Sequence, residues 1–312
     1  MNNLKLLIIE GNTKKENLSF KEAGCIPQSK NFEEQIKSLV PNCEIDIVEP
    51  GDESGVNKII DKLNKYNGVV FTGSTLRINE ESKEVKKHIE FAKKCFEKEK
   101  KIFAACWGLQ VTVIAAGGKC RTAPKGPHIG IAQNIEINES GKKNKLYTSK
   151  PEKFTTPAFN YDEVITPPKN SVLLASDAIN KYQALYFKVG KSEIWGLQYH
   201  PEIPYDYMVK LIKHRSKNLI EKKVFKQNKR IRCAVKFEEV IKVESKNINQ
   251  KNKNKPLECL AIKCSSIFEE TYKIKIFFAG NSIITIISEV IEVALHDLGK
   301  PWYVKHIPIH KI

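Results

Sequence analysis

No apolar run in this 312-residue chain approaches the roughly 18 residues that a membrane-spanning helix needs, so the sequence predicts no transmembrane segment. The first residues lead into a strand-like run at 4–10 and lack the apolar stretch of a signal peptide. The eight cysteines include no CxxC pair, which argues against a disulfide framework and against a zinc site. We therefore expect a cytoplasmic protein with reduced thiols, no membrane partner, no metal and no cofactor.

The net charge of +16 is unevenly distributed along the chain. Residues 205–256 carry 16 Lys and Arg against 5 Asp and Glu, a net charge of +11, which leaves +5 for the other residues. The run at 247–255 consists mainly of Asn and Lys and contains no aromatic side chain that could stack on bases. We therefore expect a solvated connecting segment rather than a nucleic-acid-binding surface.

Strand-like and helix-like segments alternate in the first third of the chain. The strand-like segments are nearly continuous apolar runs, of the kind that a parallel sheet buries on both faces. Such alternation predicts an α/β fold, with a mainly parallel sheet flanked by helices. The strands are expected at 4–10, 43–48, 68–74 and 101–104, and the helices at 31–40, 56–66 and 81–98.

Shorter strand-like segments follow Gly118 and suit antiparallel additions to the same sheet. A helix expected at 205–222 closes a first domain, which we place at residues 1–225. The shorter strands are expected at 129–132, 134–137, 154–159, 171–176, 184–189 and 193–199.

Cys106 lies where the strand-like segment 101–104 meets a helix-like run that begins near Leu109. A sharp turn between them exposes the thiol at a helix N-terminus, whose free N–H groups stabilise a thiolate. Cysteines in apolar stretches are commonly plain core residues. This stretch alone therefore leaves a structural and a catalytic cysteine both open.

A histidine and a carboxylate, His200 and Glu202, follow the last strand of the predicted sheet. An imidazole can take the proton of a thiol, and a carboxylate can fix the tautomer of that imidazole. Gly73, at a turn after another strand, can offer its N–H to the oxyanion that the Trp107 N–H also meets. Because the chemistry of α/β sheets collects at the carboxyl ends of the strands, we predict that these residues converge.

Three short motifs carry a resemblance to a known family: TGS at 72–74, CWGLQ at 106–110 and QYHPE at 198–202. They resemble those of class I glutamine amidotransferases, in particular stand-alone proteins similar to the amidotransferase domain of GMP synthase. The resemblance covers about residues 4–225. Two positions depart from the family pattern, since Tyr161 stands where many relatives have histidine and His128 stands where glutamate is usual.

The resemblance implies a triad, an oxyanion hole and a set of substrate contacts. The residues that it implies are Cys106 as nucleophile, His200 as general base and then acid, Glu202 as the group that orients His200, Gly73 and Trp107 as oxyanion donors, and Gln110, Asn160 and Tyr161 as substrate contacts.

The implied activity is release of ammonia from the glutamine side-chain amide through a γ-glutamyl thioester. The chain carries no SGGxDS or GxxxxGK[ST] loop, so no acceptor synthetase is visible in it. We expect either an acceptor enzyme in trans or a stand-alone hydrolase of another γ-glutamyl amide. A third alternative is a non-catalytic protein with a vestigial triad that binds RNA or a protein.

The remainder of the chain predicts a small β-rich module of unknown function. We assign 226–256 to a basic connector and the start of this module, and 257–312 to its remainder. Residues 278–302 resemble the C-terminal part of an uncharacterised bacterial domain. The module is either a chance fusion or a docking module for an acceptor enzyme. We expect a frayed terminus rather than a metal site at His306 and His310. Strands are expected at 232–237, 240–243, 257–264, 272–278 and 283–287, and a short helix at 289–298.

Overall fold

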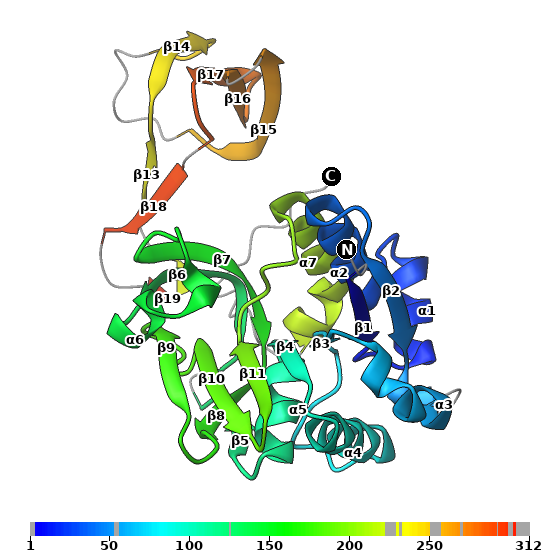
Figure 1. The fold of residues 1–312 in the computed structure, drawn as a ribbon. Coiled ribbons are helices and arrows are strands. Elements are labelled where there is room, and N and C mark those ends of the chain that lie inside the picture. Colours follow the sequence, from blue (N-terminus) through cyan, green and yellow to red (C-terminus); the bar gives the residue numbers. More distant parts are fainter. Residues whose placement is uncertain are drawn as a thin grey trace. The chain divides into compact units, whose positions relative to one another are not determined.

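The computed structural model describes residues 4–52, 56–124, 126–221, 229–230, 233–249, 257–268, 271–291, 293–298 and 302–303. Contacts within the chain divide it into two compact units, Met1–Phe225 and Lys226–Ile312, and each is described by itself (Figure 1). Within the described ranges, no helix is long and apolar enough to cross a membrane.

A nine-stranded sheet in the order β2-β1-β3-β4-β11-β10-β9-β6-β7 forms the centre of the first unit. The strands β2, β1, β3, β4 and β11 run parallel, and each later neighbour in the order is antiparallel. The predicted α/β class, a mainly parallel sheet with antiparallel additions, is confirmed. The strands are β1 (Lys5–Ile9), β2 (Glu44–Val48), β3 (Gly68–Phe71), β4 (Lys101–Ala105), β6 (His128–Ile137), β7 (Lys153–Asn160), β9 (Val172–Ser176), β10 (Ala184–Val189) and β11 (Ser192–Leu197).

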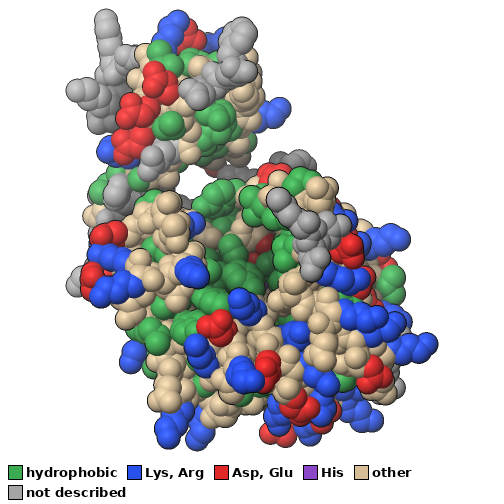
Figure 2. Space-filling view, in the orientation of Figure 1, with side chains coloured by type: hydrophobic (Ala, Val, Ile, Leu, Met, Phe, Trp, Pro, Cys, Tyr) green, Lys and Arg blue, Asp and Glu red, His purple; other side chains and the backbone are tan. Residues whose placement is uncertain are grey.

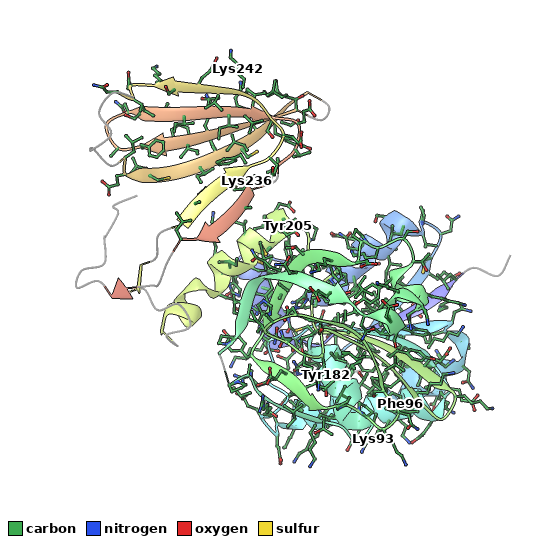
Figure 3. All side chains as sticks on the ribbon, turned by 90° about the vertical axis from the view of Figure 1, so that its left-hand side faces the viewer. Lys93, Phe96, Tyr182, Tyr205, Lys236 and Lys242 are labelled. Carbon is green, nitrogen blue, oxygen red and sulfur yellow. The ribbon has the colours of Figure 1, made fainter. Side chains whose placement is uncertain are left out.

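Helices cover both faces of the sheet because its strands are apolar at successive positions. In β1, Ile8 packs with Phe32 of α2 on one face, whereas Leu7 and Ile9 belong to the core cluster of α4 and α5 on the other. Within α4, Phe96 is buried and Lys93 is exposed (Figure 3). The helices are α1 (Lys14–Glu22), α2 (Gln28–Leu39), α3 (Val56–Asp61), α4 (Lys83–Glu97), α5 (Trp107–Ala115), α6 (Glu139–Lys142) and α7 (Tyr205–Glu221), with 3-10 turns at Pro50–Asp52, Leu63–Lys65 and Lys145–Tyr147.

The polar stretch before α2, for which no element was expected, forms helix α1. Its N-terminus is a capping box, in which the Glu16 carboxylate accepts from Thr13 N at 2.8 Å and Thr13 Oγ1 accepts from Glu16 N at 3.4 Å. Phe20 is its only buried side chain, so the apolar periodicity is weak. The capping residues Thr13 and Glu16 were the one pattern in the sequence that could have predicted this helix.

Two further differences lie in the antiparallel half of the first unit. The strands expected at 129–132 and 134–137 form one strand, β6, which has a bulge between Ala132 and Ile135. A separate two-stranded sheet, β5 (Lys119–Thr122) with β8 (Asp162–Thr166), was not expected. Its polar residues hide the alternation that predicts a strand.

The second unit is built from antiparallel strands, as its sequence predicted. β16 and β17, which contain the strands expected at 272–278 and 283–287, form a hairpin. The four-stranded sheet has the order β14-β17-β16-β15, with Lys242 exposed on the edge strand β14 (Figure 3). The strands are β12 (Lys229–Arg230), β13 (Cys233–Phe237), β14 (Val240–Lys246), β15 (Cys259–Phe268), β16 (Thr271–Phe278), β17 (Ser282–Ser288), β18 (Val293–Asp297) and β19 (Trp302–Tyr303).

The prediction of a helix at 289–298 was wrong, because this segment contains the strand β18, which pairs with β13. Phe237 lies opposite Val293 in that ladder, so a partner more than fifty residues away determines the local structure. His306 and His310, and most of the Asn/Lys run, lie outside the described residues. On the face of the first unit that Figure 2 shows, Lys and Arg are interspersed with Asp and Glu.

Candidate active site

The turn between β4 and α5 holds Cys106 in a strained backbone conformation. Its φ is 51° and its ψ is −107°, and its N–H donates to Leu197 O of the neighbouring strand β11 at 2.6 Å. A non-glycine residue costs about 1–3 kcal/mol in such a region, and such strain clusters at functional sites. Cys106 is only 3% exposed, so the turn does not expose it to solvent as the sequence predicted, and its Sγ lies 3.4 Å from Phe159 O.

Gly108 allows α5 to start directly against β3. A Cβ at this position would lie 2.5 Å from Phe71 O and 2.7 Å from Phe71 Cβ, both parts of a central strand that cannot move aside. Glycine is therefore required here by a close approach of the backbone.

We expect Gly108→Ala to destabilise the protein by about 1–3 kcal/mol, because the added methyl group overlaps Phe71. Helix propensity alone predicts the opposite sign, a gain of about 1 kcal/mol. Urea unfolding followed by far-UV circular dichroism measures the difference. A variant as stable as the wild type, or more stable, would rule out the close contact.

His200 follows β11 and is held by its backbone and its ring. Its N–H donates to Pro157 O at 2.9 Å, and its Nδ1 lies 2.6 Å from Glu202 Oε1. Both side chains are 3% exposed or less. Burial lowers the pKa of His200, but the charges of Glu202 and Cys106, together with the hydrogen bond to Glu202, outweigh burial and raise the pKa to about 10.

The protonated state of His200 therefore depends on its acidic neighbours. We expect Glu202→Gln to lower the pKa of His200, since it removes the nearest negative charge; ¹⁵N chemical shifts of the imidazole against pH measure it. Because folding raises this pKa from 6.5, His200 contributes its full stabilisation below about pH 6.5 and loses it as the pH rises towards 10. An unchanged titration in the variant would contradict this coupling.

The loop after β3 brings Gly73 against both groups. A Cβ on Gly73 would lie 2.8 Å from His200 Cε1 and 3.8 Å from Cys106 Cβ. The Gly73 carbonyl accepts from Thr72 Oγ1 at 2.9 Å, and Gly11 packs directly against that carbonyl. These two contacts fix the position of the Gly73 carbonyl.

The sequence-predicted substrate contacts lie around a cavity of about 330 Å³ that Cys106 and Trp107 also line. Gln110 Nε2 donates to Asp162 O at 2.8 Å and to Gln198 Oε1 at 3.2 Å. Asn160 Nδ2 lies 3.2 Å from Asp162 O, and its Oδ1 has no hydrogen-bond partner in the described part of the chain. The volume suits a ligand of amino-acid size.

The two departures from the family pattern occupy different places. Tyr161 lines the cavity, with the Arg77 Cζ atom 5.1 Å from its ring centroid. His128 is buried, and its Nδ1 lies 3.0 Å from Asn180 Nδ2. Since Asn180 Oδ1 also lies 3.5 Å from Asn160 Nδ2, His128 is linked to the cavity through one intermediate side chain.

Several cavity residues were not identified from the sequence, and Arg77 is the most firmly held. Its Nε and Nη2 donate to the two carboxylate oxygens of Asp162 at 2.9 and 2.5 Å, and Nη2 also donates to Thr122 Oγ1. Asp162 is 2% exposed. This ion pair therefore fixes the turn whose backbone carbonyl holds Gln110. The other unpredicted residues around the cavity include Glu16, Glu80, His214 and Arg215.

We expect Arg77→Ala to lower the free energy of unfolding by about 3–5 kcal/mol, because it leaves the buried Asp162 carboxylate without a counter-charge. Arg121→Ala is the matched control. Its partner is Glu163 and its side chain is 53% exposed, so its loss should cost at most about 1 kcal/mol. Urea unfolding at pH 7 compares the two, and equal losses would contradict the structural role of the Arg77 pair.

Comparison with known proteins agrees with this arrangement. Residues 29–208 match the family model described as glutamine amidotransferase class-I, and residues 211–310 match a family described as a protein of unknown function, DUF2948. A γ-glutamyl-L-1-hydroxyisopropylamide hydrolase of a Pseudomonas species is 33% identical over 225 residues, which cover 71% of this chain and 75% of the relative. One subunit of the glutamine-hydrolysing GMP synthase of Methanococcus aeolicus is 31% identical over 139 residues, 40% of this chain and 68% of that one.

Among solved structures, a glutamine amidotransferase from Thermotoga maritima has the same fold, with a TM-score of 0.55 and 21% identity, over 72% of this chain and 87% of that one. The family match spans more than half of the chain. The chain therefore belongs to the class I glutamine amidotransferase family.

Proposed function

We propose that the chain hydrolyses γ-glutamyl amides through a γ-glutamyl thioester at Cys106. One observation carries this proposal: a cysteine held at φ 51° at a strand-to-helix turn adjoins a His200–Glu202 pair whose Nδ1–Oε1 distance is 2.6 Å. A nucleophile, a base and a group that orients the base are the parts that covalent catalysis by cysteine requires.

In the first half of the reaction, the Cys106 sulfur attacks the amide carbon of the γ-glutamyl group. A C–S bond forms and the carbonyl electron pair moves to oxygen, where the N–H groups of Gly73 and Trp107 stabilise the negative charge. His200, protonated by the thiol, donates its proton to the amide nitrogen. The C–N bond then breaks and the amine leaves, as ammonia when the substrate is glutamine.

In the second half, His200 removes a proton from water, and the resulting hydroxide attacks the thioester carbon. The C–S bond breaks, glutamate leaves, and the proton on His200 returns to the sulfur. Glu202 keeps Nδ1 protonated throughout, so that Nε2 is the atom that exchanges protons. Gln110, Asn160 and Tyr161 contact the glutamyl part in the cavity.

The likeness to a γ-glutamylamide hydrolase over 71% of the chain favours a substrate whose amine is released to solvent. A second candidate is glutamine, with the ammonia passed to a separate acceptor enzyme, and the likeness to one GMP synthase subunit favours it. The two share every chemical step up to the fate of the amine.

The test is to incubate the purified protein with L-glutamine and with a series of γ-glutamyl alkylamides, and to measure ammonia or amine together with glutamate. The proposal expects equal amounts of amine and glutamate from at least one substrate. Release from alkylamides supports the stand-alone hydrolase, whereas release from glutamine alone supports the ammonia donor. Absence of release from every substrate would sink the proposal.

A further inference from the structure

An arginine of α7, Arg215, faces the same cavity as Cys106 and has no charged partner among the described residues. Its Cζ lies 5.8 Å from the ring centroids of both Phe20 and Phe159, so aromatic side chains hold the guanidinium group in place. Its Nε is buried and has no hydrogen-bond partner among the residues that the structure describes. In that same part of the chain, no carboxylate lies within ion-pair distance of Arg215.

The contrast with Arg77, the other arginine of the cavity, is direct. Asp162 neutralises Arg77 through two hydrogen bonds, whereas Arg215 forms no ion pair within the described ranges. Burial lowers the pKa of Arg215, but a guanidinium group remains protonated in proteins. Arg215 is partly buried, so its charge is poorly solvated, and an anion that binds to the guanidinium group offsets that cost.

We propose that Arg215 binds a carboxylate of the substrate, and this inference rests on the γ-glutamyl amide hydrolysis proposed above. The planar guanidinium fork matches a carboxylate in a bidentate geometry. Two carboxylates are candidates: the α-carboxylate of the glutamyl group, and a carboxylate on the amine side, as in a γ-glutamyl amino acid. In both cases Arg215 is a specificity-determining residue.

The charges of the remaining cavity wall suit an amino-acid head group. Glu16 and Glu80 line the cavity as well, and Glu16 is fixed there by Thr75 Oγ1, which donates to it at 2.5 Å. A wall that carries both a free positive charge and carboxylates is complementary to a group with a carboxylate and an ammonium. This favours an α-amino acid moiety over a simple anion.

The α-carboxylate is tested by binding, without turnover. In the Cys106→Ala background, calorimetry compares the binding of L-glutamine with that of L-glutaminamide, in which an uncharged amide replaces the α-carboxylate. If Arg215 binds this group, Arg215→Met weakens glutamine binding by about 10- to 100-fold and leaves glutaminamide within about twofold. Arg215→Lys, which keeps the charge, restores part of the loss.

The amine-side carboxylate is tested by turnover. γ-Glutamylglycine and γ-glutamylethylamide differ in that carboxylate, so an Arg215→Met loss of kcat/KM confined to γ-glutamylglycine assigns Arg215 to the amine side. Arg121→Met, a surface arginine paired with Glu163, is the control for loss of one positive charge.

If neither comparison distinguishes Arg215→Met and Arg215→Lys from the Arg121→Met control, the proposal is overturned. If Arg215→Met does not fold, the wild-type comparison decides, because equal affinity for glutamine and glutaminamide together with equal turnover of the other two substrates also overturns it. Arg215-dependent binding without any turnover would contradict the hydrolase proposal and leave the carboxylate assignment supported.

Discussion

Replacement of Cys106 by alanine is expected to reduce the release of amine from γ-glutamyl amides to the uncatalysed background, a loss of roughly 10⁴-fold or more. The thiol is the group at the strand-to-helix turn that can form the covalent intermediate, and its removal leaves water without an activated acyl group to attack. Amine release measured under saturating substrate quantifies the loss.

Cys43→Ala provides the matched control for the loss of a thiol. Cys43 is buried and its Sγ lies 3.6 Å from Glu44 O, and it does not line the cavity. This variant should keep activity within about twofold of the wild type, as expected for a site away from the chemistry. Equal activity of the Cys106 and Cys43 variants would contradict the assignment of the nucleophile.

Replacement of His200 by glutamine is expected to lower kcat by about 10²- to 10⁴-fold, because it removes the group that we propose transfers protons in both halves of the reaction. Gln keeps a hydrogen-bonding side chain of similar length beside Glu202, so the fold should be retained. The affinity for a bound substrate should change little, because the proposed role of His200 is proton transfer rather than holding the glutamyl group.

The accompanying comparison is Glu202→Gln, which keeps the shape of the carboxylate and removes its charge. It should lose less activity than His200→Gln, because the imidazole remains. Its orientation is then less well fixed and its pKa is lower. Steady-state kinetics of the two variants give the order. A His200→Gln enzyme with near wild-type kcat would exclude His200 as the base.

The parallel half of the fold was predictable because its physical signal is local. Parallel strands that are buried on both faces are continuous apolar runs, as β3 is, and the glycines that follow such runs mark the turns. The convergence of Cys106, His200 and Gly73 was expected because parallel strands place their carboxyl ends at one edge of the sheet.

The other features depend on partners that are distant in the sequence. β18 has the composition of a short helix and is a strand only because β13 lies beside it. The Asp162 carboxylate meets Arg77 across 85 positions, which no spacing in the sequence indicates. Tertiary pairing determines both features, so local patterns could not reveal them.

The position of Arg215 in the sequence could have indicated a role at the site, although none of the three motifs contains it. It lies four residues after Leu211 and seven after Met208, both buried in α7, so all three share one face of the helix. An arginine on the apolar face of a helix is unusual, and it indicates a partly buried charge that a ligand can pair with. The same helix brings His214 and Arg215 to the cavity from outside the three sequence motifs.

The most direct test of Cys106 as the nucleophile is to treat the protein with an electrophilic glutamine analogue and to map the modified cysteine by mass spectrometry. Of the eight cysteines, Cys106 alone should be modified, with one label per chain, and excess L-glutamine should protect it. Modification of another cysteine with Cys106 intact would contradict the account.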